Sequence, residues 1–256
     1  MSIILNENEW AEDMITKHSL GDKPTQTLRR VAGYYHDNKY GKKDIRRLLE
    51  MYLVSCDPSI SLVKWADTID RVVKNVDKRR SINISSIDIT EPELDIISEL
   101  KGTQLRRLAF TILCVSKYWD AVSKDNCHWV NTPDNEIMRM ANIHTSIKRQ
   151  SLLFGMLIDQ KLIKPSKRVD NLNVQVLFAK EGKTAMQITD FRNLGFQYLK
   201  YMGGPYYECQ CCGLVVKEGA SPTNPGHKYC PECAVAVKTK QSVESVMRRR
   251  LSVPKS

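Results

Sequence analysis

Four of the eight cysteines in this chain form two pairs near its C-terminal end. Cys209 pairs with Cys212 and Cys230 with Cys233, and two residues separate the members of each pair. Seventeen residues lie between the pairs. A Cys-x2-Cys pair folds into a tight knuckle, and two knuckles supply the four thiolates that tetrahedral zinc prefers. The spacing therefore predicts one Zn²⁺ site, closed to water and structural rather than catalytic.

Two further side chains compete for a place among these ligands. Cys211 would give a Cys-x-Cys pair with Cys209, and His227 lies shortly before the second pair. We favour Cys212 over Cys211, because its spacing from Cys209 matches that of the second pair. His227 is expected to be an exposed loop residue. A redox role for the two pairs is the minor alternative. It is disfavoured because one metal ion accounts for both pairs.

The composition indicates a folded, basic chain. Its 256 residues are 42% hydrophobic and 27% charged, and the formal net charge is +10. These values suit one to two ordinary domains, or two small domains with a metal-stabilised appendage. The positive charge favours a polyanionic partner, DNA first and RNA second, over generic solubility. No apolar run reaches the roughly eighteen residues of a transmembrane helix, so no membrane partner is expected.

Cysteine usage and the first residues indicate a cytoplasmic protein. The N-terminal sequence becomes acidic at once and lacks the basic start and apolar run of a secretory signal. Cysteines in a chain without a signal favour reduced thiols and metal ligands over disulfides. Cys56, Cys114 and Cys127 stand singly, and we expect each to be a small, buried, reduced side chain.

Helical patterns dominate the region 1–101. Apolar residues at helical spacing predict helices over Thr25–Asn38 and Lys42–Cys56, with a third after them. Thr90 and Glu93 have the spacing of a capping box and predict the start of a further helix. This region is therefore expected to be a helical N-terminal domain.

The central region, 102–202, contains a short helix, a tight turn and a longer helix, preceded by a long apolar helix. Periodicity predicts the helices as Gln104–Ser123, Pro133–Ala141 and Ser146–Lys161. Two alternating runs then predict a hairpin with strands at Asn173–Ala179 and Thr184–Thr189, joined by a polar turn at Lys180–Lys183.

This order of elements resembles a winged helix-turn-helix over about Thr103 to Thr189. The resemblance implies DNA binding, with Ser146–Lys161 as the recognition helix in the major groove. It implies DNA contacts from the start of that helix and from the start of the wing, made by Thr145, Ser146, Lys148, Arg149, Gln150, Lys164, Lys167 and Arg168. Arg149 suits guanine and Gln150 suits adenine, because their planar groups match those base edges. Lys161 departs from the pattern, since many such modules have Gly there.

Winged helices also bind proteins, so the alternative is that Lys148 and Arg149 are ordinary solvated residues of a protein-binding module. Three apolar residues of the same helix, Ile147, Phe154 and Leu157, are expected to pack beneath the module. Its other apolar residues need a further cover, either the N-terminal region or a second copy in a homodimer. These residues are Leu152, Leu153, Met156 and Ile158.

The last region, 206–256, combines the cysteine pairs with a basic tail. An aromatic-rich helix over Asp190–Met202 precedes it. The segment Tyr207–Arg250 resembles a zinc ribbon, or a treble clef if Ala234–Arg250 forms a helix directly after the second knuckle. The tail either adds non-specific affinity for phosphates or is a solvated terminal helix.

The expected fold is mainly α with small β, comprising a helical N-terminal region, a winged helix and a C-terminal zinc ribbon. The chain lacks the phosphate-binding loop, the nucleophile elbow and the His-Glu-x2-His motif, so we do not expect an enzyme. The combination loosely resembles DNA-binding regulatory or replication-accessory proteins of phages and mobile elements. The alternative is a protein-binding adaptor or inhibitor that acts on a larger host or phage complex.

Overall fold

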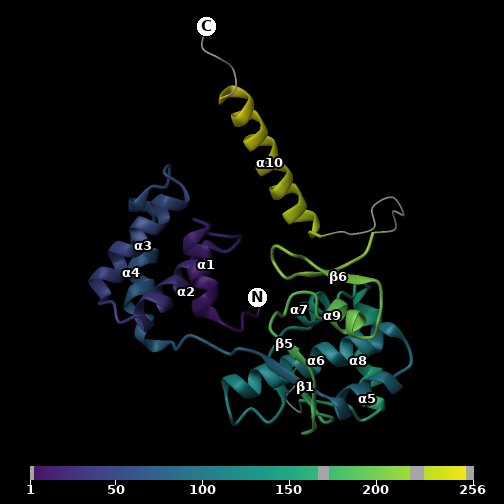
Figure 1. The fold of residues 1–256 in the computed structure, drawn as a ribbon. Helices are drawn as coiled ribbons and strands as arrows, with labels where there is room; N and C mark the ends of the chain where they lie inside the picture. The colour runs from purple at the N-terminus through teal and green to yellow at the C-terminus, as the bar shows by residue number, and fades with distance from the viewer. Residues whose placement is uncertain (1–2, 167–172, 220–227, 252–256) are drawn as a thin grey trace. The chain divides into compact units, whose positions relative to one another are not determined.

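The computed structural model of the chain describes residues 3–166, 173–219 and 228–251. These residues form a mainly α structure with three small sheets, which confirms the expected fold class (Figure 1). The chain divides into two compact units, residues 3–87 and residues 88–256. The second unit takes in all of β1 (Ile87–Thr90) except Ile87, and α5 (Glu91–Glu99), which the sequence pattern had grouped with the N-terminal region. None of the described helices is long and apolar enough to cross a membrane.

The first unit is helical and has its own apolar core. Its elements are α1 (Glu7–Thr16), α2 (Pro24–Asp37), α3 (Lys42–Cys56), α4 (Leu62–Lys74) and the short 3-10 helix η1 (Val76–Lys78). Leu28, Val31, Ile45 and Leu49 are fully buried where α2 and α3 pack. Apolar residues at helical spacing predicted the helices α2 and α3, and both predictions are confirmed.

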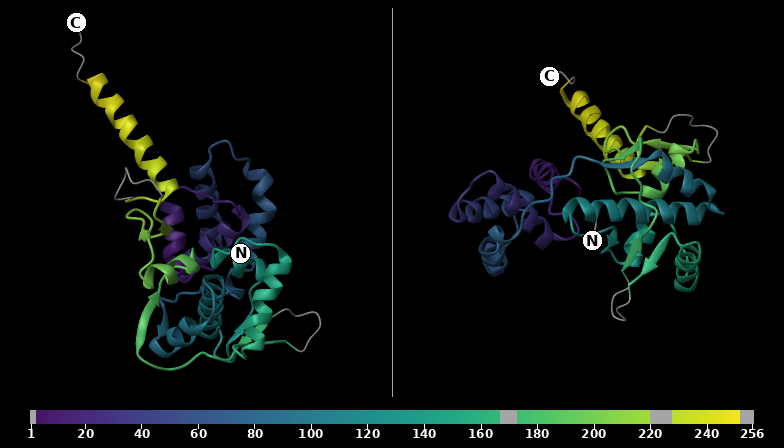
Figure 2. Two further views of the ribbon diagram at one scale, coloured as in Figure 1. Left: turned by 90° about the vertical axis from the view of Figure 1, so that its right-hand side faces the viewer. Right: turned by 90° about the horizontal axis from the view of Figure 1, so that it is seen from below.

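The second unit is built around α6 (Thr103–Val122), whose central turns are buried on every side. The helices α7 (Asp134–Met140), α8 (Ile147–Asp159) and α9 (Leu194–Tyr201) pack against α6. Buried residues occur in α6 from Leu105 to Tyr118, without the polar face of a surface helix. The helix therefore acts as the core of this unit, and the other elements pack around it (Figure 2, where α6 is teal).

A three-stranded antiparallel sheet accompanies these helices. Its strands are β2 (Trp129–Val130), β3 (Ile163–Pro165) and β4 (Val174–Val176), in the spatial order β2-β4-β3. Along the chain, α7 and α8 lie between β2 and β3. The outer strands both pair with β4, Trp129 opposite Gln175 and Ile163 opposite Val176.

The predicted hairpin between 173–179 and 184–189 is wrong. The partner of β5 (Thr184–Ile188) is β1 (Ile87–Thr90), and the partners of β4 are β2 and β3. The intervening residues 180–183 reach the start of α5 instead of turning back. There the Glu91 amide donates to the Lys183 carbonyl at 2.9 Å, and a Cβ added to Gly182 would lie 2.9 Å from Pro92.

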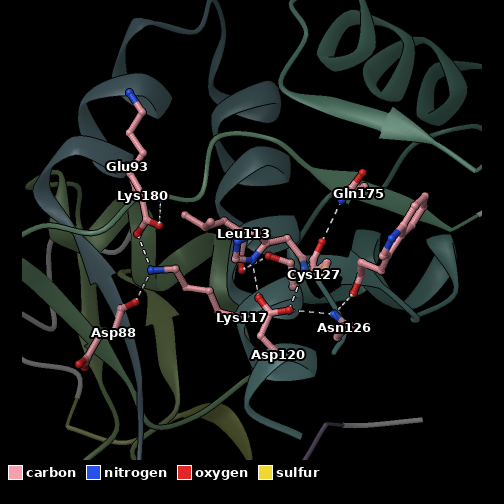
Figure 3. Close-up of polar contacts among 12 residues, drawn as sticks. Asp88, Glu93, Leu113, Lys117, Asp120, Asn126, Cys127, Gln175 and Lys180 are labelled. Atoms are coloured by element: carbon pink, nitrogen blue, oxygen red, sulfur yellow. Dashed lines mark hydrogen bonds and ion pairs between the residues drawn. The ribbon is translucent and has the colours of Figure 1, made fainter. Parts of the chain in front are cut away.

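Glu93 holds this crossing in place and is fully buried. Its carboxylate accepts hydrogen bonds from the Lys180 amide at 2.9 Å and from the Lys117 ammonium at 2.7 Å (Figure 3). It also accepts from the Thr90 amide at 2.8 Å, as the predicted capping box requires. One carboxylate therefore forms hydrogen bonds with the residue before α5, with the second half of α6 and with the segment that precedes β5.

The turn that leads into β2 is fixed by Asp120 of α6. Cys127 and His128 both have positive φ, at 51° and 63°. The Asp120 carboxylate accepts from the His128 amide at 2.8 Å and from the Asn126 side chain at 3.0 Å. The Gln175 amide group of β4 donates to the Cys127 carbonyl at 3.0 Å, so the same turn joins α6 to the sheet (Figure 3).

Candidate metal centre and nucleic-acid interface

The two cysteine pairs converge in the structure. The Sγ atoms of Cys209, Cys212, Cys230 and Cys233 all lie within 4.8 Å of one another. Cys209 and Cys230 are buried, and the other two are half-buried. Four sulfur donors at this separation fit a thiolate-binding ion with tetrahedral geometry and leave no ligand position for water. The predicted metal-ligand set is therefore brought together.

A β-hairpin forms the first knuckle. Its strands are β6 (Tyr206–Glu208) and β7 (Val215–Lys217), and they pair antiparallel. The Gly213 amide donates to the Cys209 carbonyl at 2.9 Å, and the Cys209 amide donates to the Leu214 carbonyl at 2.9 Å. Gly213 has a φ of +71°, which glycine adopts at little cost. These contacts close the turn around the first two thiols.

The second knuckle lies at the start of a long helix, α10 (Pro231–Leu251). The Ala234 amide donates to the Cys230 carbonyl at 2.8 Å, so Cys230 stands immediately before the first helical turn. The Cys233 amide lies 3.5 Å from the Cys230 Sγ. The Gln210 amide donates to the Lys228 carbonyl at 2.8 Å and joins the two knuckles. The helix directly after the second knuckle is the feature that distinguishes a treble clef from a ribbon.

The structure describes one of the two competing ligands, Cys211, but not the other, His227. Cys211 is exposed and is not a member of the sulfur cluster found among the described residues. His227 lies outside the described residues. The geometry therefore supports Cys212, whose spacing from Cys209 repeats that of the second pair.

The thiols of the cluster differ in acidity. Burial raises the pKa of Cys209, but backbone amides that donate to its sulfur outweigh burial and lower this pKa to about 6. Burial raises the pKa of Cys212, and a hydrogen bond with Cys230 raises the pKa of Cys233. Several thiolates so close together repel one another unless a cation neutralises them, so the arrangement as a whole suits a bound divalent ion.

Side chains just before and at the start of α9 connect this hairpin to the helical core. The Arg192 guanidinium donates to the Cys212 carbonyl at 2.7 Å, and the Asn193 side chain donates to the Val215 carbonyl at 2.9 Å. Asn193 also accepts a hydrogen bond from Asn142, in the turn between α7 and α8, at 2.9 Å. Sequence reasoning missed these residues, because Asn142 and Asn193 lie 51 positions apart and such a separation carries no local pattern.

The predicted nucleic-acid residues at the start of α8 do not all point to solvent. Ser146 caps the helix, with its side chain accepting from the Arg149 amide, and Lys148 and Arg149 are exposed. Thr145 and Gln150 are half-buried, and the Gln150 amide group donates to the Thr145 carbonyl at 3.1 Å. One N–H donor of Gln150 is therefore already used inside the protein.

The basic residues near the wing are only partly described. Lys164 lies in β3 and is exposed. The predicted contacts Lys167 and Arg168 lie outside the described residues. Within the described part of the chain, no carboxylate forms an ion pair with Lys148, Arg149 or Lys164.

The packing of α8 differs from the prediction at two positions. Ile147 is 81% exposed, whereas Leu153 is buried together with Phe154 and Leu157. The buried residues recur at helical spacing on the face that packs against α6 and β3. Ile147 lies in the first turn of the helix, before the buried residues, and Leu152 in the middle of the helix is 50% exposed.

Lys161 explains how α8 ends without the expected glycine. Its φ is +57°, the left-handed conformation that glycine usually supplies after a helix. The next amide, that of Leu162, donates to the Leu157 carbonyl at 3.0 Å, which completes a Schellman-type cap. The exit geometry is therefore kept, with a lysine in a conformation that is strained for side chains with a Cβ.

Comparison of the chain with protein-family models, with curated proteins and with solved structures finds no match. Function is therefore inferred from the geometry of the residues described above.

Proposed function

We propose that this chain is a DNA-binding protein of the regulatory or replication-accessory kind. In this proposal the segment from α6 to β4, residues 103–176, forms a winged helix whose α8 enters the major groove, with RNA as the alternative polyanion. The observation that carries the proposal is the element order α6-β2-α7-α8-β3-β4 together with the sheet order β2-β4-β3. That order puts a helix-turn-helix directly before an antiparallel pair of strands, as a winged helix requires.

The charges at the start of α8 support this role. Lys148 and Arg149 occupy the first turn of the helix, where a recognition helix presents side chains to base edges. Both are exposed and neither has a described carboxylate partner. A guanidinium there is free to contact guanine in two places, and Lys164 on β3 is available for a phosphate. The Gln150 side chain is less suited to reading adenine, because one of its N–H donors already bonds to the Thr145 carbonyl.

The bound metal is proposed to be Zn²⁺, held by Cys209, Cys212, Cys230 and Cys233 in a treble-clef-like module. Four thiolates and no water position favour zinc, which suits borderline-soft sulfur donors. The ion would supply a cross-link between the β6–β7 hairpin and α10, and no catalytic chemistry is assigned to it. The four side chains hold the ion, and the amides around Cys209 stabilise its thiolate.

Fluorescence anisotropy with labelled duplex DNA, single-stranded DNA and RNA, titrated at several salt concentrations, tests the proposal. We expect duplex affinity to fall steeply with salt and to drop by about tenfold or more in Lys148→Glu/Arg149→Glu. The matched control is Lys101→Glu/Lys124→Glu, which makes the same charge change at two exposed residues beside the ends of α6. Equal loss in both variants, or no duplex binding at low salt, would overturn the proposal.

A protein-binding role is the second candidate, and the exposure of Ile147 and Leu152 on α8 favours it. A large apolar side chain that is 81% exposed, with another at 50% on the same helix, suits a protein partner or a second copy of the chain better than a phosphate backbone. Ile147→Ser should leave DNA affinity within about twofold if α8 binds protein only. If Ile147 contacts a thymine methyl group, the same substitution weakens duplex binding and spares single strands.

A further inference from the structure

A cavity of 370 Å³ lies within the first unit, and its lining includes no residue of the cysteine cluster or of α8. Its walls come from α1, α2, α4, η1 and the residues just after η1. Its volume lies at the lower end of the range for small-molecule sites. The charged residues that line it are one acid and five bases, namely Glu7, Arg29, Arg30, Arg71, Lys78 and Arg79.

Glu7 orients two of these bases. Its side chain is only 5% exposed, and its carboxylate accepts from the Arg30 guanidinium at 3.1 Å and also from Arg79. The second carboxylate oxygen accepts from the Ile82 amide at 3.1 Å. The Arg30 side chain is almost as buried as Glu7, and its guanidinium lies 5.2 Å from the Trp10 ring centre. The two arginines are therefore held in fixed directions before any ligand binds.

The other three bases have no such partner. Among the described residues, no carboxylate forms an ion pair with Arg29, Arg71 or Lys78. Counting one charge for each side chain, the lining carries five positive charges and one negative charge, a net of +4. Like charges on the wall of one concavity raise its positive potential, whereas those on a convex helix face spread their field into water. A bound anion relieves this repulsion.

The shape of the cavity narrows the class of anion. Val72 and Val76 give it apolar wall, and Gly33 leaves room where a Cβ would approach the Ser81 hydroxyl to 3.1 Å. Guanidinium groups bind phosphate through paired hydrogen bonds, and an apolar wall beside them suits the uncharged part of the same molecule. We propose that this cavity binds the phosphate groups of a nucleotide, either a free nucleoside phosphate or the 5′-phosphate end of a nucleic-acid strand.

Isothermal titration calorimetry on the full chain tests this binding. The protein carries Lys148→Glu/Arg149→Glu, so that the face of α8 proposed to bind DNA does not contribute. The probes are adenosine and guanosine 5′-diphosphates, inorganic pyrophosphate, adenosine, and one trinucleotide with and without its 5′-phosphate. We expect saturable binding of the phosphorylated probes and none of adenosine or of the trinucleotide that lacks the phosphate.

Arg29→Ala/Arg71→Ala should weaken this binding by about tenfold or more, because charge-assisted hydrogen bonds to phosphate are lost. Both side chains are exposed, so circular dichroism and the melting temperature should match those of the parent. Arg47→Ala, an exposed arginine of the same unit outside the cavity, is the matched control and should not weaken it. Lys78→Ala gives a second, independent substitution in the cavity.

The relative affinities of the probes distinguish a free nucleotide from the end of a strand. Tighter binding of the nucleoside diphosphates than of the 5′-phosphorylated trinucleotide identifies a free nucleotide, and the reverse order identifies a strand end. Both orders support the proposal when the cavity variants weaken binding and Arg47→Ala does not. The proposal is overturned if no phosphorylated probe binds saturably, or if Arg47→Ala weakens binding as much as the cavity variants do.

Discussion

Asn142 donates a side-chain hydrogen bond to Asn193 at 2.9 Å, and both residues have left-handed backbone conformations, with φ of 55° and 53°. Asn142 lies in the turn before α8, and Asn193 occupies the position just before the first residue of α9. Asn193 in turn donates to the Val215 carbonyl of the β6–β7 hairpin at 2.9 Å. One pair of side chains thus connects the proposed recognition helix to the cysteine cluster.

Asn193→Gly tests this connection while keeping the left-handed backbone, which glycine adopts without strain. Loss of the two side-chain hydrogen bonds should lower the free energy of unfolding of the second unit by about 1–3 kcal/mol. Asn193→Asp keeps the acceptor for Asn142 but not the donor to Val215, so a smaller loss is expected. Urea denaturation followed by circular dichroism measures both. A loss in Asn193→Asp as large as that in Asn193→Gly would contradict the role of the Asn142 hydrogen bond.

Removal of the metal should unfold the cysteine module and leave the first unit intact. A strong chelator, or Cys230→Ser, should abolish the bound zinc measured by atomic absorption and increase protease cleavage within residues 206–251, since the fold of small metal modules depends on the ion. The matched control is Cys211→Ser, which removes an exposed thiol outside the cluster and should keep the full zinc content. Zinc loss in Cys211→Ser would contradict the assigned ligand set.

Lys161→Gly should stabilise the second unit. Lys161 has φ +57°, and relief of this left-handed strain outweighs the extra chain entropy of glycine by about 0.5–1 kcal/mol. Lys161→Ala removes the same charge but keeps the Cβ, so it should give no gain. Thermal denaturation at matched ionic strength compares the three proteins. An equal gain in both variants would assign the effect to charge and not to backbone conformation.

Glu93→Gln should destabilise the second unit strongly. Glu93 is fully buried and Lys117 is 19% exposed, so the substitution leaves a largely buried ammonium without its countercharge, at a cost of about 3 kcal/mol or more. Glu91→Gln is the matched control, because the Glu91–Lys183 pair is exposed and its loss should change the stability little.

A double-mutant cycle with Lys117→Met measures the coupling between Glu93 and Lys117. The double variant Glu93→Gln/Lys117→Met should lose less stability than the sum of the single losses. Additive losses would show that Glu93 acts only through the Thr90 and Lys180 amides.

Local signals in the sequence determined the parts of this protein whose contacts lie within one element. The bounds of α3 follow from apolar residues at helical spacing, and the Glu93 carboxylate accepts from the Thr90 amide because Glu93 follows Thr90 by three positions. The cysteine spacing also sufficed for the ligand set, since a two-residue gap limits each pair to one knuckle. The helix α1 has no comparable signal, because the residues it buries are Glu7 and Ala11.

Tertiary structure alone decided which distant segments meet. The alternating run at 184–189 was read correctly as a strand but paired with the wrong neighbour, because a strand pattern specifies a buried face and not a partner. The contact of Gln150 with Thr145, the link from Asn142 to Val215 through Asn193, and the gathering of five bases around Glu7 depend on how helices pack. Spacing along the chain encodes geometry only within a few residues, and beyond that distance packing of the core determines which side chains are neighbours.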